Sequence, residues 1–402
     1  MLGALLLLAP STPVSPFVLN DDALEPVAHQ VSTIRGSSPL SAVPVDFLDR
    51  DALNDSLRKS VERTYPEDER LARQQVLVLL RLLDPGQDQL DVVQALLPDQ
   101  VVGTYDEQDK RIHLLGPEDT PSARVRVTFA HEFVHALQDQ QYDLARLRAK
   151  PSVNADQSLA VQAVIEGDAI LAQQLWTTTN LTPAEIATLT APRIDPPAPL
   201  PAVTRAEQRF PYVYGPRLAI EAYRRWGGYG GVARLLSEPP TSTAQVLHPD
   251  RYFNGPQPVE VDLSEVPQRL GPGWEAPKTN VPGELLLRGL LEQYVPTNRA
   301  IEGASGWAGG RWILLSGSGR LVLGIKMLWD SDDKASAFFQ IYGDGLLNQP
   351  SSQLTQAETG PDSLTVAEPG WAATMRQRGD VVTAAYADDP LIAATVLSAL
   401  EP

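Results

Sequence analysis

Two histidines and a glutamate occur together in residues 127–140 of the chain. His131, Glu132 and His135 form the pattern His-Glu-x-x-His inside a stretch with the apolar spacing of a helix. Because each residue of an α-helix turns by about 100°, His131 and His135 lie about 40° apart and present their imidazoles to one point. Two such nitrogens make half of a tetrahedral zinc site, and the pattern is typical of zinc hydrolases.

Glu132 lies at the edge of this ligand face, about 60° to the side of His135. In metal-assisted hydrolysis a carboxylate takes a proton from the attacking water, so Glu132 is the predicted general base. Phe129 and Phe133 fall on the opposite side of the helix and are expected in a core. With five histidines among 402 residues, a chance occurrence of the whole pattern is expected in fewer than about one chain in a hundred.

A third ligand must come from elsewhere, because two histidines leave a zinc site incomplete. A second strong helix is predicted for residues 158–176, and Glu166 falls on its inward apolar stripe, where a carboxylate needs a partner. Together with the two histidines, Glu166 is predicted to hold one Zn²⁺; the alternative is an ordinary helix residue. A glycine inside a helix, such as Gly167, lowers helix stability by about 1 kcal/mol relative to alanine. Its presence here therefore indicates that the motif helix or a substrate approaches the backbone closely. Asp168 points about 200° away from Glu166 and is a poor co-ligand.

The elements around these residues mix strands and helices. A short strand is predicted at residues 42–48, two helices follow it, and a hairpin with a polar turn is predicted at 101–115. This order of elements along the chain, a strand, helices, a hairpin and then the motif helix, is typical of an α+β protein. Residues 178–206 are rich in Thr and Pro and are predicted to form a long surface loop, and a further helix is predicted at 218–226.

The sequence pattern changes after Pro256. A Gly- and Ala-rich linker is predicted at residues 302–310, and two strand-strand-helix units follow it. These units form a small C-terminal α+β domain without histidine, for which binding, autoinhibition and structural cover are equally open roles. The predicted division is a leader-like segment at 1–20, a domain at 21–275 that carries the His-Glu-x-x-His motif, and the C-terminal domain at 276–402.

The first residues look like part of a secretory leader. Met1–Ala9 is apolar and leads into a spacer to Pro16, but no Lys or Arg precedes Arg35, so the basic start of a leader is missing. We predict export to the periplasm, cell envelope or extracellular space; the alternative is the unstructured apolar N-terminus of a cytoplasmic protein. No stretch reaches the roughly 18 apolar residues of a membrane helix, so no stable membrane span is predicted.

The amino-acid composition restricts the kinds of partner and metal ligand that the protein can have. The chain is 43% hydrophobic and 21% charged, as expected of a globular protein. The net charge of -17 argues against nucleic acid and against an anionic membrane surface, because either would require a basic patch. The absence of cysteine excludes disulfides and thiolate ligands. Any metal must therefore be held by histidines and carboxylates.

The motif residues resemble those of the gluzincins, the thermolysin-type zinc metallopeptidases with two His and one Glu on zinc. The resemblance is carried by the His-Glu-x-x-His motif at 131–135 and by the later Glu166-Gly-Asp-Ala segment. Residues 131–140, together with 239–243 and 247–249, are similar to a group of poorly characterised exported bacterial proteins with this zincin core. The resemblance covers residues 40 to 260.

This resemblance implies an edge strand, in the hairpin at 101–115, that aligns an extended peptide over the metal. It also implies a hydrogen bond from a C-terminal histidine to the oxyanion, a role for which His248 and Tyr214 compete; the alternative for His248 is loop packing. Thermolysin-like enzymes place an Asp four residues after the ligand Glu, but this position is Ile170 here. Asp139, one turn past the second histidine, is then the candidate for holding a zinc ligand.

The sequence therefore predicts a zinc metallopeptidase that acts on a peptide or protein substrate. Glu132 takes the water proton and returns it to the leaving amine, while His248 or Tyr214 stabilises the oxyanion. Two alternatives stay open: hydrolysis of a non-peptide amide or ester, and a zinc-binding envelope or interaction module without turnover. Glu132 argues against the module, since a pure binding site has no use for a base.

Overall fold

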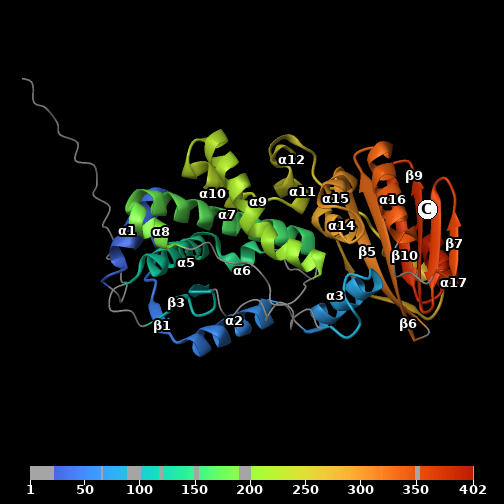
Figure 1. Ribbon diagram of the computed structural model, residues 1–402, viewed down its shortest axis with the longest axis horizontal. Helices are drawn as coiled ribbons and strands as arrows, with labels where there is room; N and C mark the ends of the chain where they lie inside the picture. The colour runs from blue at the N-terminus through green and yellow to red at the C-terminus, as the bar shows by residue number, and fades with distance from the viewer. Residues whose placement is uncertain are drawn as a thin grey trace, which may run out of the picture.

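The computed structural model describes residues 22–64, 67–87, 101–116, 121–148, 154–189, 201–317, 319–348 and 354–401. Helices and strands both contribute, which confirms the predicted α+β class. Figure 1 shows a helix-rich N-terminal part at one end of the molecule and a sheet-rich C-terminal part at the other. The leader-like segment at 1–20 lies outside the described residues. Among the described helices, none is long and apolar enough to cross a bilayer.

The N-terminal part combines a small sheet with a set of helices. Its elements are α1 (Glu25–Arg35), β1 (Val45–Leu48), α2 (Arg50–Thr64), α3 (Glu67–Leu79), β2 (Gly103–Asp106), β3 (Arg111–Leu115), α5 (Ala123–Tyr142), α6 (Leu144–Leu147), α7 (Ala155–Asn180), α8 (Pro183–Thr188), α9 (Ala202–Trp226), α10 (Tyr229–Ser237), α11 (Thr243–Leu247) and α12 (Pro249–Asn254). The strands are ordered β1-β3-β2, with β1 parallel and β2 antiparallel to β3. The predicted strand and hairpin are confirmed, and β2 is an edge strand.

Helix α5 carries the His-Glu-x-x-His motif and packs against this sheet. Ser122 caps the helix by accepting a hydrogen bond from the backbone N–H of Val125. Phe129 and Phe133 are fully buried in the core that α5 shares with the strands, as the helical spacing predicted. The side of α5 that carries the histidines is thereby turned towards α7.

The C-terminal part is built on a seven-stranded antiparallel sheet of order β4-β5-β6-β10-β9-β8-β7. Its elements are α13 (Val266–Leu270), β4 (Trp274–Asn280), α14 (Glu284–Leu291), α15 (Thr297–Ala304), β5 (Trp307–Gly317), β6 (Arg320–Trp329), α16 (Asp332–Leu347), β7 (Gln356–Thr359), β8 (Ser363–Glu368), β9 (Trp371–Arg378), β10 (Val381–Ala387) and α17 (Pro390–Leu400). Helices α14 to α16 share a core with one face, and α13 and α17 with the other. The two strand-strand-helix units are confirmed, but the linker predicted at 302–310 is wrong, because α15 and β5 occupy it.

The two parts are interleaved in sequence. The predicted boundary between residues 275 and 276 falls inside β4, which pairs with β5, so the C-terminal part begins earlier, at α13. Helix α3 from the N-terminal end also joins this part, since Val76 and Leu77 lie in the core of the large sheet. Trp371 donates a hydrogen bond from Nε1 to the carbonyl oxygen of Leu79 at 2.9 Å. Local periodicity predicts a helix but does not say which core it joins.

Helices α7 and α9 cross at two glycines. A Cβ atom at Gly167 would overlap the carbonyl oxygen of Gly215, and one at Gly215 would overlap that of Ala163. The close approach predicted at Gly167 is confirmed, but the neighbour is α9 rather than α5. The long loop predicted for 178–206 is wrong where the structure describes it, because α7 extends to Asn180, α8 occupies Pro183–Thr188 and α9 begins at Ala202; residues 190–200 of the range lie outside the described residues.

Helix α9 runs through two prolines, and for this reason the sequence placed its start too late. Pro211 and Pro216 each lack an N–H and cost a helix about 3 kcal/mol or more. Both prolines are buried, and the packing of α9 against α7 and α14 offsets this cost. The helix therefore begins at Ala202 instead of Leu218.

A buried acidic side chain lies where the two parts meet. Asp156, in the first turn of α7, accepts hydrogen bonds from the backbone N–H of Thr243 at 3.0 Å and from its hydroxyl at 2.5 Å. Its carboxylate also lies against Gly283, where a Cβ atom would overlap it. Burial raises the pKa of Asp156 to about 7; the bonds from Thr243 oppose this rise and the charge of Glu284 adds to it.

Asp156→Asn should flatten the pH dependence of stability. The carboxyl group ionises near pH 4 in the unfolded chain but at about 7 in the folded protein, so between these values the folded state holds the extra proton and stability falls as the pH rises. Between these two pH values the ionisation of Asp156 lowers the free energy of unfolding by up to about 4 kcal/mol. The asparagine variant, which resembles the protonated form, should not show this loss of stability. Urea unfolding at pH 5 and pH 7.5 measures the difference, and an equal fall in both proteins would contradict the prediction.

Candidate metal centre

Glu166 on α7 reaches the two histidines of α5. Its Oε2 atom lies 3.3 Å from Nε2 of His131 and 3.6 Å from Nε2 of His135, and the two Nε2 atoms are 3.1 Å apart. One potential ligand atom from each side chain lies within 4.8 Å of the others. The side chains are 15%, 11% and 8% exposed for His131, His135 and Glu166. The structure thus brings the three predicted ligands together in a largely buried group.

The donor atoms of this group suit a divalent metal. Glu166 Oε2 is buried and has no hydrogen-bond partner, so the oxygen that faces both imidazoles is unsatisfied within the protein. Two imidazole nitrogens and one carboxylate oxygen are a ligand set of catalytic zinc sites, which leave a further position open for water or substrate. These residues therefore fit Zn²⁺.

Without a metal, the group holds a proton at neutral pH. Burial alone lowers the pKa of His135, but the charges of Glu166 and Glu132 outweigh burial and raise it to about 9. Burial raises the pKa of Glu166, but the charges of His135 and His131 outweigh burial and lower it well below its usual value. Because zinc binds the neutral imidazole, a metal must displace this proton.

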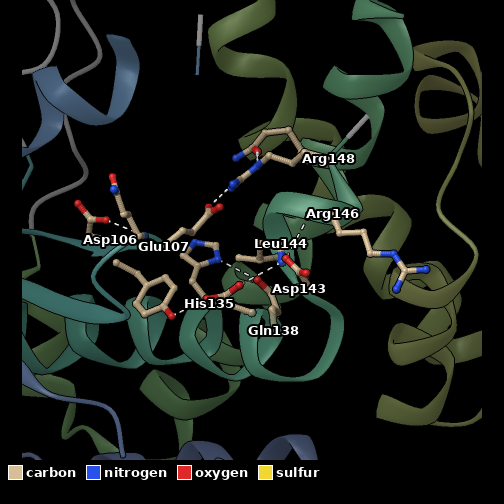
Figure 2. A network of polar contacts seen from close by, with 12 residues as sticks. Asp106, Glu107, His135, Gln138, Asp143, Leu144, Arg146 and Arg148 are labelled. Atoms are coloured by element: carbon tan, nitrogen blue, oxygen red, sulfur yellow. Dashed lines mark hydrogen bonds and ion pairs between the residues drawn. The ribbon is translucent and has the colours of Figure 1, made fainter. Parts of the chain in front are cut away.

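A glutamine fixes the tautomer of His135 (Figure 2). Nδ1 of His135 lies 2.9 Å from Oε1 of Gln138. Gln138 donates from Nε2 to the carbonyl oxygen of Ile165 at 3.0 Å and to Oδ2 of Asp168 at 2.7 Å, so both amide hydrogens are used and Oε1 must accept. His135 therefore carries a hydrogen on Nδ1, and in the neutral ring Nε2 is free to act as a ligand.

A buried ion pair holds this glutamine in turn. Arg35 of α1 donates to Asp168 through Nη2 at 2.5 Å and through Nε at 3.2 Å, and Asp168 is fully buried. Asp168 is not in the ligand group, as its helical position predicted, but it orients a ligand through Gln138. His131 has no such support among the described residues, because its Nδ1 is buried without a hydrogen-bond partner.

Asp139 holds neither histidine, so that prediction is wrong. It accepts hydrogen bonds from the hydroxyl of Tyr105 at 2.7 Å and from Nζ of Lys110 at 2.5 Å. One step along a helix turns a side chain by about 100°, and this difference places Gln138 rather than Asp139 against the second histidine. Asp139 instead ties the β2–β3 hairpin to α5.

Glu132 lies beside the edge strand. Its Oε2 accepts a hydrogen bond from the backbone N–H of Tyr105 at 2.8 Å. The backbone N–H of Leu115 donates to the carbonyl oxygen of Val102. Since bonded and non-bonded pairs alternate along an antiparallel ladder, Tyr105 directs its N–H away from β3. Strand β2 thus fixes Glu132 close to the imidazoles, and its charge contributes to the raised pKa of His135.

The two candidates for the oxyanion contact make other contacts. His248 Nε2 lies 2.6 Å from Oε1 of Glu284, a buried residue of α14. The hydroxyl of Tyr214 accepts a hydrogen bond from Nη1 of Arg288 at 2.8 Å. The structure does not bring His248 into the metal group, and its contacts match the loop-packing alternative.

Tyr212 of α9, which the sequence analysis passed over, faces the metal group. The residue as a whole is 52% exposed, but its hydroxyl lies against the carboxylates. The charge of Glu166 is the first cause that raises the pKa of Tyr212 well above its usual value, followed by burial of the hydroxyl and the charge of Glu132. A phenol with so high a pKa stays protonated and can donate a hydrogen bond.

The helix crossing accounts for the position of Tyr212. It precedes Gly215 by three residues and so shares a helix face with it. Glu166 directly precedes Gly167, the glycine that Gly215 meets on α7. The sequence did contain a signal for Tyr212: a glycine in each of two helices, with an aromatic residue one turn before the second glycine. The prolines of α9 concealed it, because they predict a non-helical chain.

One family model matches the C-terminal part of the chain. Residues 268–396 match the model of a family described as a domain of unknown function (DUF8575). Among solved structures, the crystal structure of the extracellular domain of PknH from Mycobacterium tuberculosis matches with 16% identity and a TM-score of 0.25, covering 36% of this chain and 97% of that chain. No curated protein matches. The family match begins within α13 and does not include the metal group.

The protein should bind one Zn²⁺ per chain and release about one proton in doing so at pH 7.5, because His135 must lose its proton. The affinity should rise with pH up to about 9, where the histidine becomes neutral in the free protein. Metal analysis, with calorimetry in two buffers of different ionisation enthalpy, measures both quantities. Glu166→Ala should abolish this binding, whereas Glu207→Ala, which removes an ion-paired glutamate outside the group, should retain it. Equal zinc binding without Glu166 would overturn the ligand assignment.

Proposed function

We propose that this protein is a zinc-dependent metallopeptidase with a zincin core of the gluzincin type. The observation that supports this most directly is the unsatisfied Oε2 atom of Glu166, buried beside Nε2 of His131 and of His135. When bound, zinc supplies Lewis-acid activation of a water molecule and of a carbonyl oxygen. The remaining steps belong to side chains and backbone groups of the chain itself.

Glu132 is the general base of the proposed reaction. It accepts a proton from the attacking water and delivers it to the leaving amine. Its Oε2 is held by the backbone N–H of Tyr105, which leaves Oε1 for the proton.

Tyr212 takes the role for which the sequence offered His248 and Tyr214. Its protonated hydroxyl donates a hydrogen bond to the oxyanion that develops on the substrate carbonyl. An interaction of this kind strengthens as the charge develops, so it raises kcat more than it lowers KM. The raised pKa of Tyr212 supports this role, because the donor persists over the working pH range.

The edge strand β2 supports a peptide or protein as the substrate. The alternation of bonded pairs directs the backbone groups of Gly103 and Tyr105 away from β3, where an extended chain can add as a further strand. Glu132 occupies the N–H of Tyr105, so a peptide aligned along β2 lies next to the base. A non-peptide amide or ester would make no use of this strand.

A zinc-binding envelope or interaction module without turnover is the competing function. Glu132 argues against it, because metal binding alone needs no carboxylate held beside the ligands. We further propose that the protein is exported, on the basis of the apolar segment Met1–Ala9.

Glu132→Gln separates the enzyme from the binding module. Glutamine keeps the size of the side chain but cannot take the water proton, so cleavage of a mixed-peptide substrate should fall by about 10² to 10⁴. Zinc content and the urea unfolding midpoint should stay close to wild type, since Glu132 is not a ligand. A variant that cleaves as fast as the parent shows that Glu132 is not the base. If both proteins hold zinc and neither cleaves any peptide, the module is the better account.

Tyr212→Phe should lower kcat by about 10² to 10³ with little change in KM, because it removes one donor to the oxyanion. Tyr214→Phe provides the matched control, as it deletes a hydroxyl from the same helix that binds Arg288 instead. Steady-state kinetics of both variants on one peptide gives the comparison. A larger loss from Tyr214→Phe than from Tyr212→Phe would reverse the assignment.

A further inference from the structure

The other carboxylate oxygen of Glu166 is engaged by a glutamine one turn earlier on α7. Gln162 donates a hydrogen bond from Nε2 to Oε1 of Glu166 at 2.8 Å. This bond satisfies Oε1 and leaves Oε2 as the oxygen that faces the imidazoles. If the Gln162 amide were turned round, its carbonyl oxygen would meet the carboxylate and repel it. The direction of this amide therefore decides whether the carboxylate of Glu166 is held with Oε2 towards the imidazoles.

Arg148 sets the direction of the amide. This residue caps the C-terminal end of α6 and donates from Nε to Oε1 of Gln162 at 2.9 Å. A guanidinium group has donors and no acceptor. The carbonyl oxygen of Gln162 must therefore face Arg148, and its NH₂ group must face Glu166.

Arg148 is itself anchored on the β2–β3 hairpin. Its Nη1 pairs with Glu107 in the turn between the two strands, as Figure 2 shows. Its charge also acts on Tyr212, where it opposes the carboxylates in their effect on the pKa. Arg148 thus lies between the hairpin, the ligand helix α7 and the tyrosine of α9, without belonging to the ligand group.

We propose that Arg148 is a positioning residue, which fixes the metal ligand Glu166 through Gln162. It restricts the amide to one orientation and thereby holds Oε2 of the carboxylate towards the two imidazoles. The proposal rests on the metal site proposed above and adds a residue that acts on it from a distance of two hydrogen bonds. Loss of groups that orient a metal ligand typically lowers metal affinity by about 10- to 100-fold.

Competition with a chromophoric chelator tests the proposal by measuring Zn²⁺ affinity. Arg148→Met should lower the affinity about tenfold, and Gln162→Met should lower it at least as much. The double variant should lose no more than Gln162→Met alone, because the arginine acts through the glutamine. Arg146→Met is the matched control: this exposed arginine lies two residues earlier and points away from the group in Figure 2. It should bind zinc as the wild type does.

Substitution of Co²⁺ for Zn²⁺ gives a readout that a purely structural role would not move. Arg148→Met and Gln162→Met should change the visible absorption of bound Co²⁺ in the same way, since both release the carboxylate, and Arg146→Met should not. If Arg148→Met fails to fold, Arg148→Lys, which keeps one donor for Gln162, should restore both affinity and spectrum.

Three outcomes overturn the proposal. Unchanged affinity and spectrum in Arg148→Met would show that the arginine does not act on the ligand. Losses that add in the double variant would show that it acts independently of Gln162. A wild-type protein that binds neither Zn²⁺ nor Co²⁺ would refute the metal site itself, which separates that failure from the first two.

Discussion

The crossing of α7 and α9 at Gly167 and Gly215 is the constraint on which the candidate site depends. Packed helices usually lie about 8 to 10 Å apart because a layer of side chains separates them. Here the backbones are in contact, since a Cβ atom on either glycine would overlap the other helix. This contact brings Glu166 from one helix and Tyr212 from the other beside the histidines of α5. Any side chain at the crossing would move the carboxylate and the phenol apart.

Two of the three candidate ligands are oriented by neutral amides that are held by charged groups. Gln138 links His135 to Asp168, and Gln162 links Glu166 to Arg148. In both cases the amide transmits orientation without placing a further charge next to the ligand. A carboxylate in the position of Gln162 would repel Glu166, whereas the glutamine keeps the arginine one hydrogen bond away. Burying charges in this way is costly unless each is paired, which the contact of Asp168 with Arg35 on α1 provides.

The sequence predicted what depends on local spacing and missed what depends on contacts between distant segments. Glu166 was found because helical periodicity puts it on the apolar stripe that faces the motif helix. Tyr212 was missed because two flanking prolines disfavour a helix, and only packing against α7 overrides them. Asp139 was proposed to hold a histidine because it lies one turn past His135, but Gln138 makes that contact. The hairpin residue Lys110 binds that carboxylate instead. Likewise the α+β class and the strand-strand-helix units follow from local patterns, but the place of α3 in the distant sheet does not.

Helix α3 has a consequence for the order in which the molecule can fold. The carbonyl oxygen of Leu79 at its end accepts a hydrogen bond from Trp371, 292 residues later, and Arg81 pairs with Glu368 at 2.6 Å across 287 residues. Contacts between such distant segments require the closure of very long loops, which is slow. On the ribosome α3 emerges long before β6, against which it packs, and before β8 and β9, which bind the end of the helix, so these contacts form only late in synthesis. The N-terminal helices and sheet can assemble during synthesis, whereas the core of the large sheet must wait for the last strands.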